Sequence, residues 1–244
     1  MKTENANDVI LGAWHGGLGD NLQFSTLPEE FYKQQGRKTY IWANTPFRNS
    51  EIYDLVWGHN PYVKGISEEE RTAGDLPDLH KSELSNCISN WENLHGLKPT
   101  NKYPKVYYQP KQRSENLSDV FLVDMSAIST GYNLSDIETQ LNNFKNDNPN
   151  KIYLGVQFNQ KFHRNQYQIH VDDIIEVETI FDYCDIMNAS HGILTLHAGQ
   201  SHLSSAMKEY NPELKSFCFM QEERYQYHKD KSLFLFDNVE YLRY

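Results

Sequence analysis

A glycine-rich turn, His15-Gly-Gly-Leu-Gly-Asp-Asn21, carries the first residues in this sequence that point to chemistry. Gly16, Gly17 and Gly19 permit positive φ angles and a close approach of the backbone to a ligand. Asp20 has two interpretations: it caps the helix that follows, or it is a general base that accepts a proton from an incoming hydroxyl. The turn completes neither a G-x-G-x-x-G loop nor a Walker A loop.

A second turn, between positions 197 and 202, combines small and polar residues in the other half of the chain. A helix that starts here would offer N–H groups and the Ser201 hydroxyl to a diphosphate. Its two histidines would add hydrogen bonds, or positive charge if their pKa values rise. The alternative is a tight connection between a strand and a helix, and the turn by itself does not choose between the two. The candidate phosphate-binding residues of this turn are His197, Ala198, Gly199, Gln200, Ser201 and His202.

The first turn is expected to lie inside a βαβ unit. Residues 8–14 form an apolar strand that runs into the turn. Apolar residues at helical spacing predict a helix over residues 20–35, with Gly36 as its C-terminal stop. Residues 39–43 form the next strand, so the crossover is right-handed and the strands are parallel.

The second turn is expected to follow a strand over residues 192–196, within a further α/β pattern. Ser135 and Glu138 have capping-box spacing at the start of a helix. Ligands of open α/β sheets bind at the carboxyl ends of strands, where both turns would lie. The other elements expected in this half are strands over residues 120–124, 151–156, 216–219 and 232–236 and helices over 135–144, 177–187 and 202–210.

The fold class that these patterns predict is α/β, with two Rossmann-like lobes. A chain of 244 residues has room for two domains of ordinary size. Residues 111–118 are polar and hold no apolar run, so the boundary is placed there. The expected lobes are residues 1–115 and 116–244.

Composition narrows the classes of partner. The chain has 23 basic and 33 acidic residues and a formal net charge of −10, with the basic residues scattered, so nucleic acid is not expected as a partner. No signal peptide and no apolar run of membrane-spanning length is visible. We therefore expect a cytoplasmic protein with at most peripheral membrane contact. The three cysteines are too few for a disulfide framework and are expected to be buried thiols.

Together, the two turns resemble the heptosyltransferase-like glycosyltransferases, family 9 of the GT-B fold. Residues 15–28 resemble the opening Gly-x-Leu-Gly-Asp loop of that family. Residues 186–207 resemble its donor loop, a strand followed by Asp-Ser-Gly-Pro-x-His-Leu-Ala-x-Ala, with matches at His202, Leu203 and Ala206. The matching stretches are short, and one falls in each expected lobe.

The resemblance implies two GT-B lobes with the site in the cleft between them. It also implies metal-independent transfer of a sugar from a nucleotide-sugar donor to a glycan or other hydroxyl acceptor, as in bacterial surface polysaccharide synthesis. Asp20 would correspond to the catalytic base, and residues 197–202, with Gly17 and Gly19, would bind the donor and its phosphates. No cofactor and no metal are expected.

The sequence departs from the family where a basic residue often neutralises the leaving diphosphate. The first strand of the second lobe leads here into residues 125–132, which hold no Lys or Arg. Ser126 is the candidate donor to the phosphates in its place. Lys161 and Arg164, after the next strand, are the candidate cations, and a surface loop is the alternative for that segment.

Three other functions compete with this interpretation. A GT-B-like protein that binds a nucleotide or glycan without turnover fits the short length and the missing cation. A metal enzyme is disfavoured because the histidines and cysteines lack ligand spacing. A dinucleotide-dependent dehydrogenase is disfavoured because the second strand ends at Asn44, where an acidic residue would bind the ribose.

Overall fold

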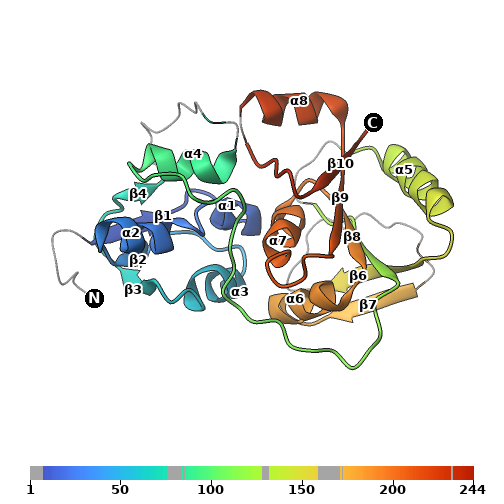
Figure 1. Ribbon diagram of the computed structural model, residues 1–244, viewed down its shortest axis with the longest axis horizontal. Helices are drawn as coiled ribbons and strands as arrows, with labels where there is room; N and C mark the ends of the chain where they lie inside the picture. Colours follow the sequence, from blue (N-terminus) through green and yellow to red (C-terminus); the bar gives the residue numbers. More distant parts are fainter. Residues whose placement is uncertain are drawn as a thin grey trace. The chain divides into compact units, whose positions relative to one another are not determined.

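The computed structural model describes residues 8–75, 84, 86–127, 132–158, 171, 173–231 and 233–244. The chain forms two compact units (Figure 1). Unit 1 comprises Met1–Tyr108 and His228–Phe236, and unit 2 comprises Gln109–Tyr227 and Asp237–Tyr244. Each unit has its own sheet, and every strand pair recorded in the two sheets is parallel.

Unit 1 is built on a four-stranded sheet with the order β3-β2-β1-β4. The order reverses beside β1, since the chain first moves outward to β3 and then returns to the other side as β4. The carboxyl end of β1, at this switch point, leads into the turn at residues 15–21. The strands are β1 (Val9–Gly12), β2 (Thr39–Trp42), β3 (Val63–Ser67) and β4 (Ala73–Gly74), and the helices are α1 (Leu18–Leu22), α2 (Leu27–Gln35), α3 (Ser50–Tyr53), the π-helical turn η1 (Asp54–Gly58) and α4 (Cys87–Leu94).

The single helix expected over residues 20–35 is wrong in one respect: it is two helices, α1 and α2. Pro28 stands in the first turn of α2. Its missing N–H cannot continue a helix from the preceding turn, where it would have to bond to the carbonyl of Phe24. The intervening residues make tighter i→i+3 bonds, such as Ser25 N–H to the carbonyl of Leu22. Gly36 is confirmed as the stop of α2, with a left-handed φ of 67°.

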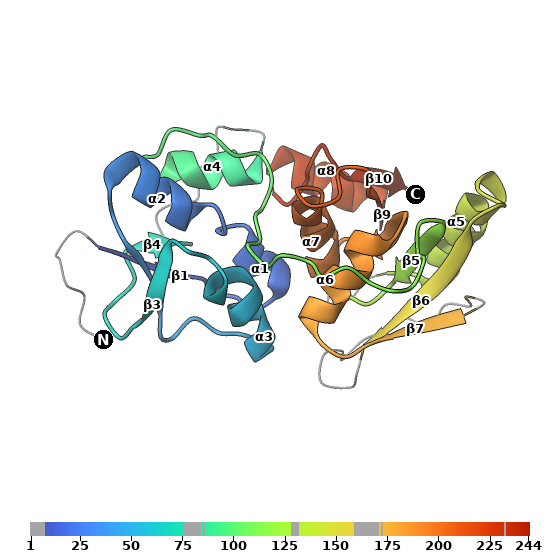
Figure 2. The same cartoon turned by 60° about the horizontal axis from the view of Figure 1, so that its bottom comes forward.

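Unit 2 is built on a six-stranded sheet with the order β10-β9-β8-β5-β6-β7. The order reverses between β5 and β8, as in doubly wound nucleotide-binding folds. Helices α6 and α7 cover one face of the sheet and α5 covers the other (Figures 1 and 2). The strands are β5 (Val120–Asp124), β6 (Ile152–Phe158), β7 (Asp173–Val177), β8 (Gly192–Leu196), β9 (Lys215–Met220) and β10 (Glu240–Arg243), and the helices are α5 (Leu134–Asp147), α6 (Ile180–Ala189), α7 (Gly199–Met207) and α8 (Glu222–Asp230), the last of which runs from unit 2 into unit 1.

Alternation along β5 explains how this sheet separates core from site. Phe121 and Val123 pack into a buried cluster that includes Ile137 and Phe144 of α5. The side chain of Asp124, the next residue, points to the opposite face, where it reaches α6. The last residue of β5 is therefore polar and buried on the side of α6 and α7.

Several expected boundaries in unit 2 are corrected by the structure. Helix α5 is capped by Asn133, whose side chain accepts from the Ser135 N–H, so Ser135 is not the N-cap. Helix α6 begins after Thr179, which caps it, and Val177 belongs to β7. The strand expected over residues 232–236 is not formed by the residues described there. The three cysteines are confirmed as buried free thiols.

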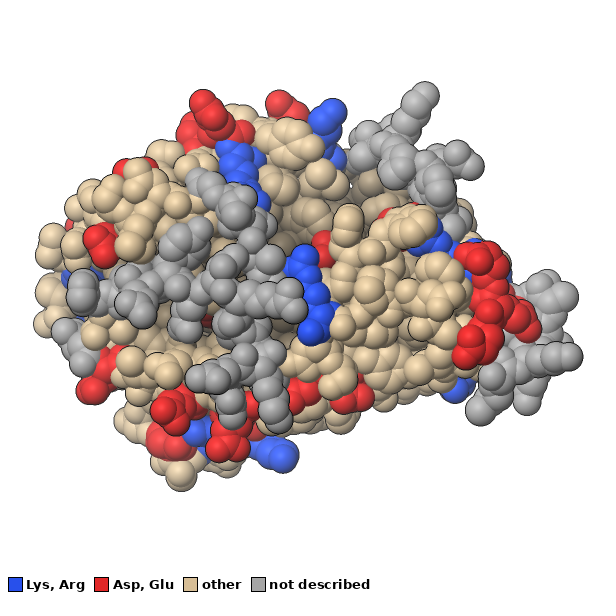
Figure 3. All heavy atoms as spheres, turned by 180° about the vertical axis from the view of Figure 1, so that it is seen from behind, with Lys and Arg blue, Asp and Glu red and all other residues tan. Residues whose placement is uncertain are grey.

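The surface matches the scattered charge of the sequence. On the face drawn in Figure 3, the basic side chains stand apart, separated by acidic and uncharged ones. None of the helices described is both long and apolar enough to cross a membrane.

Candidate functional site

The turn after β1 holds Asp20 in a fixed position. Asp20 lies in the first turn of α1, and its Oδ2 accepts a hydrogen bond of 3.0 Å from the N–H of Gly17, the N-cap. The capping interpretation is therefore correct in part, since Asp20 closes the helix from its third position. In the described part of the chain, no donor is recorded on the other carboxylate oxygen, and the side chain is half-buried. Asp20 is thus oriented and still able to accept a proton.

Gly16 and Gly17 are required for space, and the positive φ angles expected for the glycines of this turn are wrong. Gly17 has φ −73° and ψ 159°, which any residue can adopt, and neither Gly16 nor Gly19 has a positive φ. A Cβ on Gly16 would lie 2.9 Å from the carbonyl oxygen of Pro46. A Cβ on Gly17 would lie 2.6 Å from Oδ2 of Asp20. Gly17 therefore leaves room for the carboxylate of Asp20.

Two cations and an aromatic ring stand near this turn, and the sequence analysis named none of them. The exposed Arg48 donates its N–H to the carbonyl of Gly16 at 3.0 Å. Its guanidinium comes within 3.5 Å of the Cβ position of Gly17. Trp14, 55% exposed, has Arg71 4.2 Å from its ring centre. Trp14 adjoins the turn in the sequence, whereas Arg48 and Arg71 are distant from it, so no sequence signal linked the two arginines to the turn.

Gly74, the last residue of β4, and Asp75, which follows it, lie at the switch point of unit 1. The carboxylate of Asp75 accepts from the N–H of Trp14 at 2.9 Å and from Arg71 at 2.8 Å. Burial raises the pKa of Asp75, and these partners oppose the rise. Gly74 has φ 108°, and a Cβ there would clash with the carbonyl oxygen of Gly12 on β1. Asp75 therefore fixes the start of the turn that carries Asp20.

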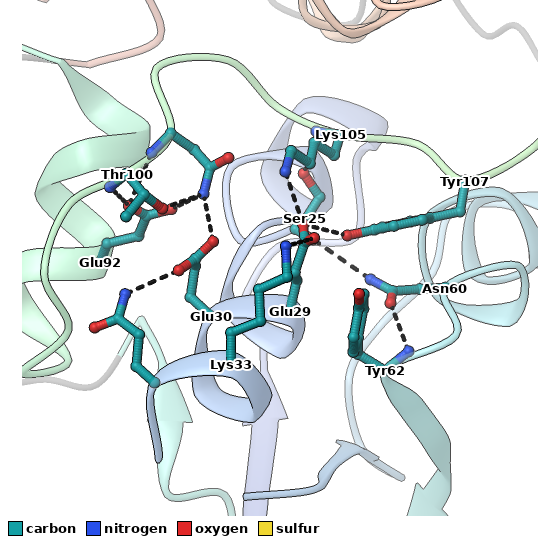
Figure 4. A network of polar contacts seen from close by, with 12 residues as sticks. Ser25, Glu29, Glu30, Lys33, Asn60, Tyr62, Glu92, Thr100, Lys105 and Tyr107 are labelled. Atoms are coloured by element: carbon teal, nitrogen blue, oxygen red, sulfur yellow. Dashed lines mark hydrogen bonds and ion pairs between the residues drawn. The ribbon is translucent and has the colours of Figure 1, made fainter. Parts of the chain in front are cut away.

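Behind this turn, α2 is held by a network of buried acids (Figure 4). Glu29 accepts from Lys105 at 2.7 Å and from the Tyr107 hydroxyl at 2.9 Å, and Lys33 pairs with its other oxygen at 2.6 Å. Burial raises the pKa of Glu29, but these three partners outweigh it and lower the pKa to about 2. The network anchors α2 to the segment that leaves unit 1. Within it, Lys33 and Lys105 compensate the negative charge of Glu29.

In unit 2, Asp124 organises the switch point between β5 and β8. Its Oδ2 accepts from the hydroxyl of Tyr183 on α6 at 2.8 Å. Its Oδ1 accepts from the N–H of Ser126 at 3.0 Å, from the Ser126 hydroxyl, and from the amide of Gln200 at 3.5 Å. Asp124 is 1% exposed. The sequence analysis missed it, although an acid that ends a buried strand was a visible signal.

The side chains of the second turn point into unit 2. Gln200 donates to the carbonyl of Ser126, so the two candidate phosphate-binding residues come together. The Ser201 hydroxyl donates to the carbonyl of Ala198 at 2.7 Å, and Nδ1 of His202 bonds to the same oxygen at 2.7 Å. Because a carbonyl only accepts, His202 carries its proton on Nδ1 here. These side chains shape the turn from inside.

The backbone of the same turn is what a ligand can reach. Ala198 and Gly199 are half-buried, whereas their neighbours from position 196 to 202 are buried. Ala198 is the N-cap of α7, and no side chain caps this helix. The first N–H groups of α7 therefore stand at the carboxyl edge of β8 with the positive end of the helix dipole.

The remaining candidates are the two cations expected to neutralise the diphosphate. Lys161 and Arg164 lie outside the described residues. Gly17 and Gly19 belong to unit 1, with Asp20, and the other candidates, Ser126 and residues 197–202, belong to unit 2. Among the residues whose placement is described, no three His, Cys, Asp or Glu side chains come together as they would around a metal ion. The metal-independent reaction stays a prediction.

Comparison with solved structures identifies the fold. The glycosyl transferase family 9 protein from Veillonella parvula superposes with a TM-score of 0.61 at 7% identity, over 98% of this chain and 87% of that chain. The iron-containing dodecameric glycosyltransferase TibC from enterotoxigenic E. coli gives 0.57 at 14% identity, over 89% of this chain and 60% of that one. The E. coli heptosyltransferase WaaC with ADP gives 0.54 at 6% identity, over 96% and 92%.

These likenesses confirm the expected GT-B fold of heptosyltransferase-like glycosyltransferases. No family model and no curated protein matches the sequence. The chain spans 60% of the TibC chain, and 58% of it in a second structure with ADP-D-beta-D-heptose.

Proposed function

We propose that this protein is a glycosyltransferase that moves a sugar from a nucleoside-diphosphate sugar to a hydroxyl group of a glycan acceptor. The observation that carries the proposal is the uncapped start of α7 at the switch point of unit 2, in a chain with the GT-B fold. Ligands of doubly wound sheets bind at this point, and a diphosphate is the anion that uncapped helical N–H groups bind well.

The proposal gives each unit its own task. Asp20 accepts the proton of the acceptor hydroxyl as that oxygen bonds to the anomeric carbon of the donor. The bond between the anomeric carbon and the phosphate oxygen breaks, and its electron pair leaves with the nucleoside diphosphate. The N–H groups of Gly199 and Gln200 stabilise that negative charge. Atoms and charge balance without a cofactor or metal.

The roles of the other residues follow from their contacts. Gly17 donates to Asp20, so we assign it to positioning the base, and Gly19 to the same helical turn. We call residues 197–202 the phosphate turn. Hydrogen bonds through Asp124 and Ala198 hold its shape, and they involve Ser126, Gln200, Ser201 and His202. Arg48 is a cation beside the acceptor-side turn.

The experiment has two stages. Thermal unfolding with ADP, UDP, GDP and dTDP identifies the nucleotide, because a ligand that binds only the folded state raises the melting temperature. The matching sugar nucleotides are then incubated with the enzyme, with and without glycan acceptors, and the released diphosphate is measured. We expect one diphosphate to stabilise the protein and its sugar nucleotide to be consumed.

The two stages separate an enzyme from a binding protein. Stabilisation by a diphosphate with no consumption of any sugar nucleotide would support a GT-B-like protein that binds without turnover. Absence of stabilisation by every diphosphate would contradict both functions.

A further inference from the structure

Arg224 is a half-buried residue of α8. It is distant in sequence from the phosphate turn of unit 2 but is linked to that turn through Tyr132. Its guanidinium carbon lies 5.2 Å from the ring centre of Tyr132, a distance typical of cation–π pairs. Tyr132 is 8% exposed. Its hydroxyl donates to the carbonyl oxygen of His197 at 3.3 Å. Arg224 is thus connected to the first residue of the turn through one aromatic side chain.

The positive charge of Arg224 also acts on Cys218, a buried thiol beside the same turn. Cys218 is buried on β9, and burial raises the pKa of its thiol to about 12. Hydrogen bonding with Thr195 and Ser201 and the positive charge of Arg224 act in the opposite direction. The field of Arg224 therefore reaches a thiol that touches Ser201 in the first turn of α7. One route runs through Tyr132, which precedes α5, and the other through Cys218 on β9, and both lead to the start of α7.

The charge of Arg224 is not used by an acid within the described residues. Arg71 pairs with Asp75, and Arg243 pairs with Glu222 at 3.5 Å. Arg224 makes no ion pair with any acidic side chain whose position is described, and it lies in a chain with ten more acidic than basic residues (33 against 23). Its positive charge therefore remains available within the described residues, and such a charge attracts an anionic ligand.

We propose that Arg224 binds the diphosphate of the nucleotide and neutralises it as it leaves. This assignment rests on the proposed function, and it supplies the cation that the segment after β5 lacks. The cation–π contact with Tyr132 holds the guanidinium, and its N–H groups make no recorded hydrogen bond with a described residue, so they are available to ligand oxygens. That edge matches a phosphate group with two parallel hydrogen bonds. The helical N–H groups and Arg224 then act on the same two phosphates.

The test is calorimetry with three probes: ADP (or the diphosphate that stabilises the wild type), the corresponding monophosphate, and inorganic pyrophosphate. The variants are R224Q, R224K and the matched control R243Q, whose arginine also stacks on a tyrosine, at 4.9 Å. We expect R224Q to weaken diphosphate and pyrophosphate binding by roughly 10- to 100-fold, the range for a lost charge-assisted hydrogen bond. The monophosphate loses less, R224K is intermediate, and R243Q binds as the wild type.

The outcomes separate this assignment from the proposed function. If R224Q binds the diphosphate and pyrophosphate as tightly as the wild type, Arg224 is not the cation, and the proposed function stands. If R243Q weakens binding as much as R224Q, the effect is one of general charge and the assignment also falls. If the wild type binds none of ADP, UDP, GDP and dTDP, both the assignment and the proposed function fall. Melting temperatures of the free variants, expected near that of the wild type, show that each is folded.

Discussion

At each of the two switch points of this molecule a strand leads through a turn into a helix, but the two turns present different groups to a ligand. In unit 1 the turn after β1 enters a helix of five residues, and its functional candidate is the half-buried carboxylate of Asp20. In unit 2 the turn after β8 enters a helix of nine residues, and its polar side chains are buried and bonded inward. The first turn offers a side chain to a ligand, and the second offers its backbone.

This difference indicates that the two units have separate roles in the proposed reaction. A short helix has a weak dipole and few aligned N–H groups, so α1 is a poor anion site, and its N-cap N–H is bonded to Asp20. The longer α7, without a side-chain cap, presents its N–H groups to a ligand. The proposed function therefore assigns proton transfer to unit 1 and phosphate binding to unit 2.

The largest effect is expected from D20N. Asparagine keeps an oxygen that accepts from the Gly17 N–H, so α1 remains capped, but it cannot take a proton. We expect the transfer rate to fall by roughly 10²- to 10⁴-fold, the usual contribution of a general base, with the affinity for the nucleoside diphosphate unchanged. Steady-state turnover and calorimetry measure the two quantities. A D20N enzyme with the wild-type rate would show that the base lies elsewhere.

The next effect concerns the acid behind the second turn. D124A leaves the Tyr183 hydroxyl and the Ser126 N–H without their buried acceptor, and we expect a loss of about 3 kcal/mol in the free energy of unfolding. Urea denaturation measures this loss. D119A, at the exposed end of the same strand where Asp119 pairs with Lys151, is the matched control and should change stability by less than about 0.5 kcal/mol. Equal effects of the two changes would mean that Asp124 does not organise the turn.

The acid behind the first turn is expected to act on stability alone. The pKa of Glu29 is about 2 in the folded protein and 4.5 ordinarily, so its carboxylate contributes stability that is complete above about pH 4.5. That contribution is lost as the pH falls toward 2, and the shift corresponds to about 3 kcal/mol at most. E29Q should be less stable at pH 7 and should lack this dependence, with turnover and diphosphate affinity unchanged. An identical acid profile for wild type and E29Q would contradict the role of the network.

The smallest effect is expected from G17A. The new methyl group would displace the Asp20 carboxylate from the Gly17 N–H, and we expect turnover to fall by roughly tenfold and stability by about 1 kcal/mol, the worth of a helix cap. G58A is the control, because a Cβ on Gly58 would find its nearest neighbour at 3.6 Å. If G17A turns over as fast as G58A, the orientation of Asp20 by Gly17 is unimportant.

Much of the fold could be predicted because buried parallel strands are continuous apolar runs. The bounds expected for residues 120–124 and 192–196 are those of β5 and β8. The unbroken helix over residues 20–35 was wrong because helical spacing was given more weight than Pro28. The cap of α5 was misassigned because Asn133 and Ser135 are both good caps, and backbone geometry decides between them.

The site could be predicted only where its residues are neighbours in sequence. Asp20 and residues 197–202 could be named as candidates because each lies in a turn after an apolar strand. The partnership of Asp124 with Gln200 spans 76 positions, and Arg224 comes from a helix with little amphipathic pattern. Such contacts follow from the order of strands in the sheet, which one sequence does not specify.

The central claim is that the donor phosphates bind the backbone of the second turn, and amide hydrogen exchange tests it most directly. Exchange is measured with and without the stabilising nucleoside diphosphate. We expect slower exchange over residues 124–127 and 197–202, and unchanged exchange over residues 29–35 of α2. Protection confined to residues 15–21, with none at the start of α7, would contradict the account.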